Sequence, residues 1–188
     1  MTAGSPSPLR ALLTTLLVAA GLAVPADAAA AQQVQSPEEF FGHEMGADRQ
    51  LAHWDDLVDY YRHLDEASPR LRLREMGAAT NGEPYVVLFV SSEENLERLE
   101  ELRQLNATLS DPRGATEAEI DRAVAEGRAV VAQSFGLHSN EVAATQTAAA
   151  FAHESVTRDD ETMRGIRENT ISVILPSLNP SGTALITE

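Results

Sequence analysis

The chain has 188 residues, enough for one domain with its own hydrophobic core. Apolar residues make up 43% and charged residues 23%, which is ordinary for a globular protein and excludes a wholly disordered chain. The formal net charge is −15 and there is no basic run, so nucleic acid is excluded as a partner. Cysteine is absent, so any zinc site must be built from His, Asp or Glu.

The N-terminus has the order of a secretory signal peptide. Arg10 precedes an apolar run of about 14 residues, 11–24, and small-residue triplets follow at 26–28 and 29–31. A membrane anchor is the alternative, but the run is shorter than the roughly 20 residues that span a bilayer. We therefore expect a signal peptide over residues 1–31, a secreted or periplasmic protein, and no stable membrane insertion once the signal is removed.

A leader segment and an amphipathic helix come next. Residues 32–47 contain Pro37 and two glycines, and we expect them to lie over the surface. Apolar side chains recur at 3.6-residue spacing over residues 48–67, which predicts a helix that Asp48 caps and Pro69 ends.

A β-hairpin and two helices are then predicted. Residues 71–75 alternate between apolar and charged, Asn81-Gly82 is a strong turn signal, and residues 85–90 form the returning apolar strand. A charged helix over 93–106 is followed by a turn. Thr116 and Glu119 then form a capping box, which predicts a short helix over 117–126.

The last third of the chain alternates between strands and helices. We predict strands over 129–135 and 170–175, with helices over 141–156 and 160–168 between them. Together with the hairpin, this order indicates an α/β fold with a mixed β-sheet flanked by helices.

His138 and Glu141 are the candidate metal ligands. They are three residues apart where a strand ends and a helix begins, so both side chains can share one face of the turn. Imidazole nitrogen and carboxylate oxygen both suit zinc, and a catalytic zinc site needs three protein ligands and a water molecule.

The spacing alone does not identify a site, because His63 and Glu66 share it. That second pair falls inside the first predicted helix, and we interpret it as part of a solvated polar face. Open α/β sheets bind ligands beyond the carboxyl ends of their strands, which favours the pair at 138 and 141. His153 is 15 residues from His138, more than 20 Å along a helix, and cannot complete the same site.

Taken in order, several motifs resemble one known family. The opening helix ends in Ser68-Pro69, and a strand ending in Gly77 leads to a hairpin over 81–85. Leu137-His138-Ser139-Asn140-Glu141 is similar to an H-x-x-E ligand pair, and Pro176 to Gly182 is similar to a P-x-x-N-P-D-G segment. Over residues 48–182 this set resembles the M14 family of zinc carboxypeptidases.

The resemblance implies a zinc-dependent peptidase that removes amino acids from the C-termini of peptide substrates. His138 and Glu141 would be its first two Zn2+ ligands, and residues 48–188 would be the N-terminal part of a carboxypeptidase-like domain.

The sequence departs from the family pattern in several ways. Ser181 stands where the family has Asp, and no histidine after His153 can serve as the third ligand. The arginine that binds the substrate carboxylate and the glutamate general base are also missing, so we assign no catalytic residue. We expect a piece of a longer enzyme that is inactive by itself.

Two other functions stay open at this point. One is the related deacylase branch, which cleaves N-acyl amino acids and differs in the arginine pocket. The other is a non-catalytic secreted binding module that keeps the fold without the metal.

Overall fold

The computed structural model describes residue 1 and residues 33–188. The predicted signal sequence therefore lies outside the described residues, apart from Met1. No helix in the described part of the chain has both the length and the apolar character to cross a membrane.

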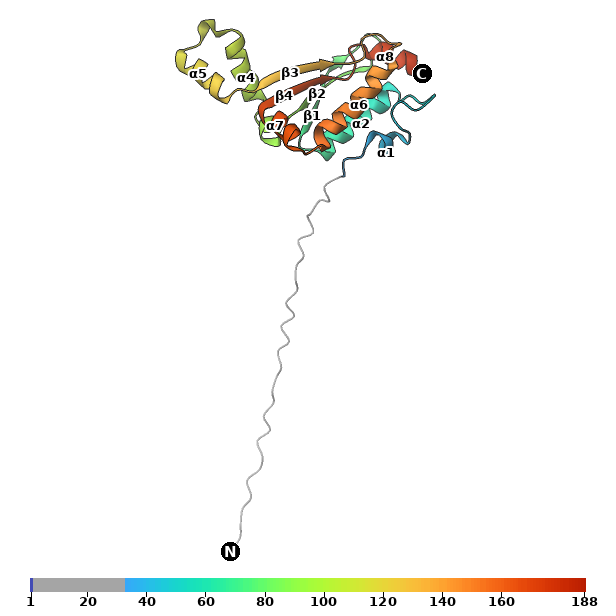
Figure 1. The fold of residues 1–188 in the computed structure, drawn as a ribbon, viewed down its shortest axis with the longest axis horizontal. Coiled ribbons are helices and arrows are strands. Elements are labelled where there is room, and N and C mark those ends of the chain that lie inside the picture. The colour runs from blue at the N-terminus through green and yellow to red at the C-terminus, as the bar shows by residue number, and fades with distance from the viewer. Residues whose placement is uncertain (2–32) are drawn as a thin grey trace. The chain divides into compact units, whose positions relative to one another are not determined.

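A four-stranded mixed sheet is the centre of the fold (Figure 1). Its strands are β1 (Leu71–Ala78), β2 (Pro84–Val90), β3 (Ala129–Ser134) and β4 (Thr170–Leu175). The spatial order is β1-β2-β4-β3, with β3 parallel to β4 and the other pairs antiparallel. The prediction of an α/β fold with a mixed sheet flanked by helices is confirmed.

The main core lies between one face of the sheet and three helices. These are α2 (Trp54–Ala67), α6 (Val142–Thr157) and α8 (Pro180–Thr187). Alternate strand residues such as Leu88 and Ile174 point into this core, together with Leu57 of α2. The apolar residues that recur at 3.6-residue spacing in the sequence therefore form the face of α2 that packs against the core.

The other sheet face is covered only in part. The chain between β2 and β3 forms α3 (Glu93–Glu97), α4 (Leu99–Ser110), η1 (Pro112–Gly114) and α5 (Glu117–Glu126). Leu102 of α4 packs with Phe89 and Ile171 in a second, smaller core. The α4–α5 hairpin projects from one end of the sheet, and α8 lies at the other end (Figure 1).

Two predicted helix boundaries were wrong. The helix expected over 48–67 begins only at Trp54, and Arg49 has a φ of 61°, outside helical geometry. The preceding chain is instead held against α6: the Ala52 N–H donates to Gln146 Oε1 at 3.0 Å, and Gln146 Nε2 donates back to the Ala52 carbonyl at 3.1 Å. The helix expected over 93–106 is two helices that meet at Arg98.

The leader segment is also more structured than expected. It contains α1 (Pro37–Phe41), which begins with a capping box between Ser36 and Glu39. Phe40 packs against the ring of Tyr60 on α2 with 5.0 Å between centroids. A helix of five residues is too short to show a period in the sequence, so its packing could not be predicted.

The far end of α6 is fixed by a buried arginine on α7 (Glu161–Asn169). The Arg167 side chain is 4% exposed and donates to the carbonyls of Ser155 and Arg158 and to Asp159 Oδ1. Carbonyls at a helix C-terminus lack intrahelical partners, so the guanidinium both satisfies them and holds α6 in place.

Candidate metal centre

The exits of β3 and β4 are hydrogen-bonded to each other. The Phe135 N–H donates to the Leu175 carbonyl at 2.9 Å, and the Leu178 N–H donates to the Phe135 carbonyl at 3.0 Å. Ser177 Oγ donates to the Gly136 carbonyl at 3.3 Å. The two motifs singled out in the sequence, 41 residues apart, therefore leave the sheet side by side at the carboxyl ends of parallel strands.

Gly136 sets the direction of the chain after β3. Its φ is 54°, and a Cβ at this position would lie 2.3 Å from Thr145 Cγ2. The exit turn therefore lies directly against the second turn of α6. Only glycine combines this left-handed backbone with so close an approach.

The turn that follows carries the candidate ligands. The Glu141 N–H donates to the His138 carbonyl at 3.1 Å, and Glu141 is the N-cap residue of α6. His138 Nδ1 lies 3.0 Å from Glu141 Oε2, and the side chains are 65% and 60% exposed. The predicted pair is thus brought together, with both donor atoms open to solvent.

These two donors fit zinc. Tetrahedral zinc with bonds of about 2.1 Å places neighbouring donor atoms about 3.4 Å apart, close to the separation found here. The described residues contain no group of three or more His, Cys, Asp or Glu side chains that could hold a metal ion. Within the described part of the chain, the site therefore offers two candidate ligands.

The other histidines are elsewhere in the fold. The interpretation of His63 as a solvated helical residue was wrong: it is 7% exposed, and its Nε2 accepts the Gln35 N–H at 3.0 Å. The alternative pair is therefore split, with His63 buried against the leader and Glu66 exposed. His153 lies further along α6, where partial burial lowers its pKa.

The segment after β4 forms the start of α8. Asn179 Oδ1 accepts the Gly182 N–H at 3.0 Å, and a Cβ on Gly182 would lie 2.3 Å from Asn179 Nδ2. Ser181, in the position where the family has Asp, is hydrogen-bonded to the hairpin turn: its Oγ accepts the Asn81 N–H at 3.2 Å and donates to Asn81 Oδ1. No pattern in the sequence predicted that the hairpin turn and α8 meet.

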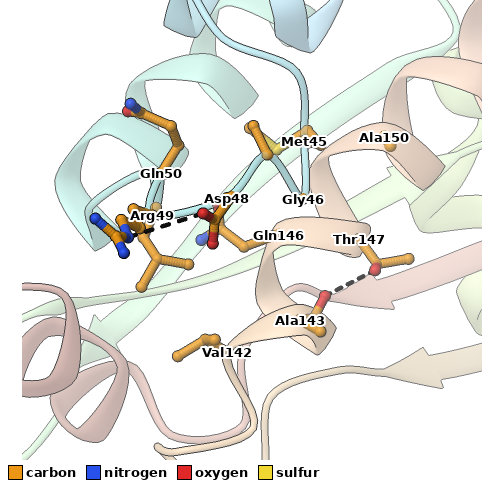
Figure 2. A pocket seen from close by; sticks show the side chains of 12 residues that line it. Met45, Gly46, Asp48, Arg49, Gln50, Val142, Ala143, Gln146, Thr147 and Ala150 are labelled. Atoms are coloured by element: carbon orange, nitrogen blue, oxygen red, sulfur yellow. Dashed lines mark hydrogen bonds and ion pairs between the residues drawn. The ribbon is translucent and has the colours of Figure 1, made fainter.

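A cavity of about 540 Å³ lies beside the start of α6 (Figure 2). Residues 45–51 form one side, and Val142, Ala143 and Gln146 belong to the other. Its one carboxylate, Asp48, does not complete a group of three possible metal ligands with His138 and Glu141, because the described residues contain no such group. The sequence did not predict this cavity, because it forms only where residues 45–51 lie beside the start of α6.

Comparison with known proteins identifies the family of this chain. The family model of the zinc carboxypeptidases, peptidase family M14, matches residues 57–188, which is more than half of the chain. The chain therefore belongs to the M14 zinc carboxypeptidase family, as the motifs predicted.

Solved structures with a similar fold include thrombin-activatable fibrinolysis inhibitor (TAFI). The match has a TM-score of 0.55 at 11% identity and covers 83% of this chain and 30% of that one. Bovine TAFI in complex with tick carboxypeptidase inhibitor matches with a TM-score of 0.46 at 13% identity, covering 72% and 33% of the two chains. The chain thus spans about a third of the length of these proteins. No curated protein matches this sequence.

Proposed function

We propose that the chain is the N-terminal part of a secreted zinc-dependent metallocarboxypeptidase that hydrolyses C-terminal peptide bonds of peptide substrates. The observation that carries the proposal is the pair of donor atoms, His138 Nδ1 and Glu141 Oε2, 3.0 Å apart at the carboxyl ends of two parallel strands. Membership of the M14 family supports the reaction class. The signal-like order of residues 10–31 supports secretion or export to the periplasm.

His138 and Glu141 would hold the metal, which in such sites polarises the scissile carbonyl and lowers the pKa of its bound water. A zinc ligand must present a lone pair, so any proton shared between Nδ1 and Oε2 has to leave when the metal binds. The backbone hydrogen bond between the two residues closes the turn that brings their side chains close together. The third ligand and the general base would come from outside the described residues.

Zinc titration of the full 188-residue chain tests the pair directly. We expect weak binding of one Zn2+ by calorimetry, because two ligands make a poor site, and at least about tenfold weaker binding for His138→Ala or Glu141→Gln. His53→Ala is the control, because His53 is exposed and its side chain makes no capping bond on α2. Equal zinc affinity in all four proteins would refute the assignment.

Activity needs a longer protein that supplies the missing groups. In that protein, His138→Ala should remove both bound zinc and the release of C-terminal amino acids, while residues 1–188 alone should show no turnover. Hydrolysis of N-acyl amino acids but not of peptides with a free C-terminus would favour the deacylase branch. A full-length product that binds no zinc and is unaffected by His138→Ala would overturn the enzyme proposal.

A further inference from the structure

A second, smaller cavity lies on the sheet face opposite α2 and α6. Its volume is about 150 Å³, and it lies between α4 and the strands. Phe89, Ile171 and Val173 line it from the sheet, and Leu99 and Leu102 from α4. Val130, the second residue of β3, also lines it, whereas His138 follows the other end of that strand. The cavity is therefore separate from the candidate metal centre.

Arg74 is exposed and lines this apolar cavity. Among the described arginines, it is the one whose guanidinium makes neither a hydrogen bond nor an ion pair. Its guanidinium lies over the Phe89 ring, 5.3 Å from the centroid. Stacking on a ring uses the flat face of the guanidinium and leaves its five in-plane N–H donors available.

The charged side chains that line the cavity favour the binding of one anionic group. Arg74, Arg103 and Glu100 all line it. Arg103 donates to both oxygens of Glu100, at 2.8 and 2.6 Å, and Gln104 Nε2 donates to Glu100 Oε1 at 3.2 Å. These bonds, with smaller effects of the Arg103 and Arg74 charges, lower the Glu100 pKa to about 2. Glu100 is thus ionised and already paired, which leaves one uncompensated positive charge in a chain of net charge −15.

We propose that this cavity binds a small monocarboxylate with an apolar body, the carboxylate on Arg74 and the apolar part against Phe89, Ile171 and Val173. A guanidinium with free N–H donors pairs well with a carboxylate. The volume has room for about five water-sized groups, which matches a short acyl chain or one apolar side chain. Such a ligand could be a free short-chain fatty acid or an apolar amino acid with a free carboxylate.

Calorimetric titration of the full chain with sodium hexanoate tests the proposal. We expect one site with a Kd of about 1 mM, the range for a ligand with so few atoms. Hexanamide, which lacks the charge, should bind about tenfold more weakly, and Arg74→Gln should weaken hexanoate binding by a similar factor. N-acetyl-leucine in a parallel titration distinguishes the two sources, since the tighter of the two probes shows whether the cavity prefers a fatty acid or an apolar amino acid.

Two further variants keep the result interpretable. Arg113→Gln removes the same charge from a side chain that is 88% exposed, on η1, and should leave hexanoate binding unchanged. Val130→Trp should block the cavity from an exposed edge position and abolish binding without removing any charge. The proposal is overturned if hexanoate does not bind, if Arg74→Gln binds it equally well, or if the chain dimerises across this face and excludes it.

Discussion

Tyr60 and Tyr61 are neighbours on α2, and both are fully buried, but their hydroxyl groups have different surroundings. Tyr60 Oη donates to the Gln35 carbonyl at 3.0 Å and so helps to hold the leader on the helix. Tyr61 Oη has no hydrogen-bond partner within the part of the chain that the structure describes. A buried hydroxyl without a partner loses its hydration and gains nothing in exchange.

The two tyrosines therefore give opposite predictions for the same substitution. We expect Tyr61→Phe to be neutral or to stabilise the fold by up to about 1 kcal/mol, because it removes only the unsatisfied group. Tyr60→Phe should cost about 1 kcal/mol or more, because it leaves the Gln35 carbonyl without its donor. Urea unfolding of both variants measures the difference, and equal costs would contradict the assigned hydrogen bonding.

The element that positions the candidate site is the turn between β3 and α6. Gly136 has a positive φ and lies against Thr145, whose Oγ1 donates to the Val142 carbonyl at 3.0 Å and so fixes the threonine rotamer. A methyl group at Gly136 would meet Thr145 Cγ2, which cannot rotate away without breaking that bond. The turn that carries the two candidate ligands thus depends on one residue before it.

We predict that Gly136→Ala destabilises the fold by about 2 kcal/mol or more, from the left-handed backbone together with the steric overlap. Gly165→Ala is the matched control, because a Cβ there meets nothing within 4 Å inside α7, and alanine should stabilise that helix by about 0.5–1 kcal/mol. Thermal unfolding compares the two. Equal and small effects would mean that the exit turn tolerates a side chain.

At the scale of the whole molecule, β3 is one of the two edge strands of the four-stranded sheet, and β1 is the other. All six of its residues are exposed, and Val130 and Val131 retain 52% and 46% of their accessible surface. The sequence predicted this apolar strand correctly but could not show that it lies at an edge with little cover. Unpaired N–H and C=O groups on such an edge can pair with another chain.

We therefore expect the 188-residue chain to self-associate as its concentration rises, measured by sedimentation velocity. Val131→Lys should reduce the association, because a charge on an edge strand opposes pairing. Val124→Lys makes the same change on α5, at a side chain that is 70% exposed and not on a strand, and should have little effect. A chain that is monomeric at all concentrations would contradict the prediction.

The sequence by itself determined the family, the α/β class and the position of most helices and strands. These features rest on local signals: apolar periodicity, the Asn81-Gly82 turn, the capping box at Thr116 and the order of motifs around His138 and Asn179. The structure confirms the predicted helices and strands, because periodicity, turns and caps act between residues that are close in the chain.

Only the tertiary structure decided which of two identical local patterns is buried and which is exposed. His63 with Glu66 and His138 with Glu141 have the same spacing, but the leader covers His63, and a strand exit exposes His138. The contacts of Ala52 with Gln146 and of Asn81 with Ser181 join residues 94 and 100 positions apart. The cavity beside Arg74 likewise brings together residues that are far apart in the chain, from Arg74 to Val173. Burial and pairing over such separations depend on how the layers pack, which no local pattern in the chain encodes.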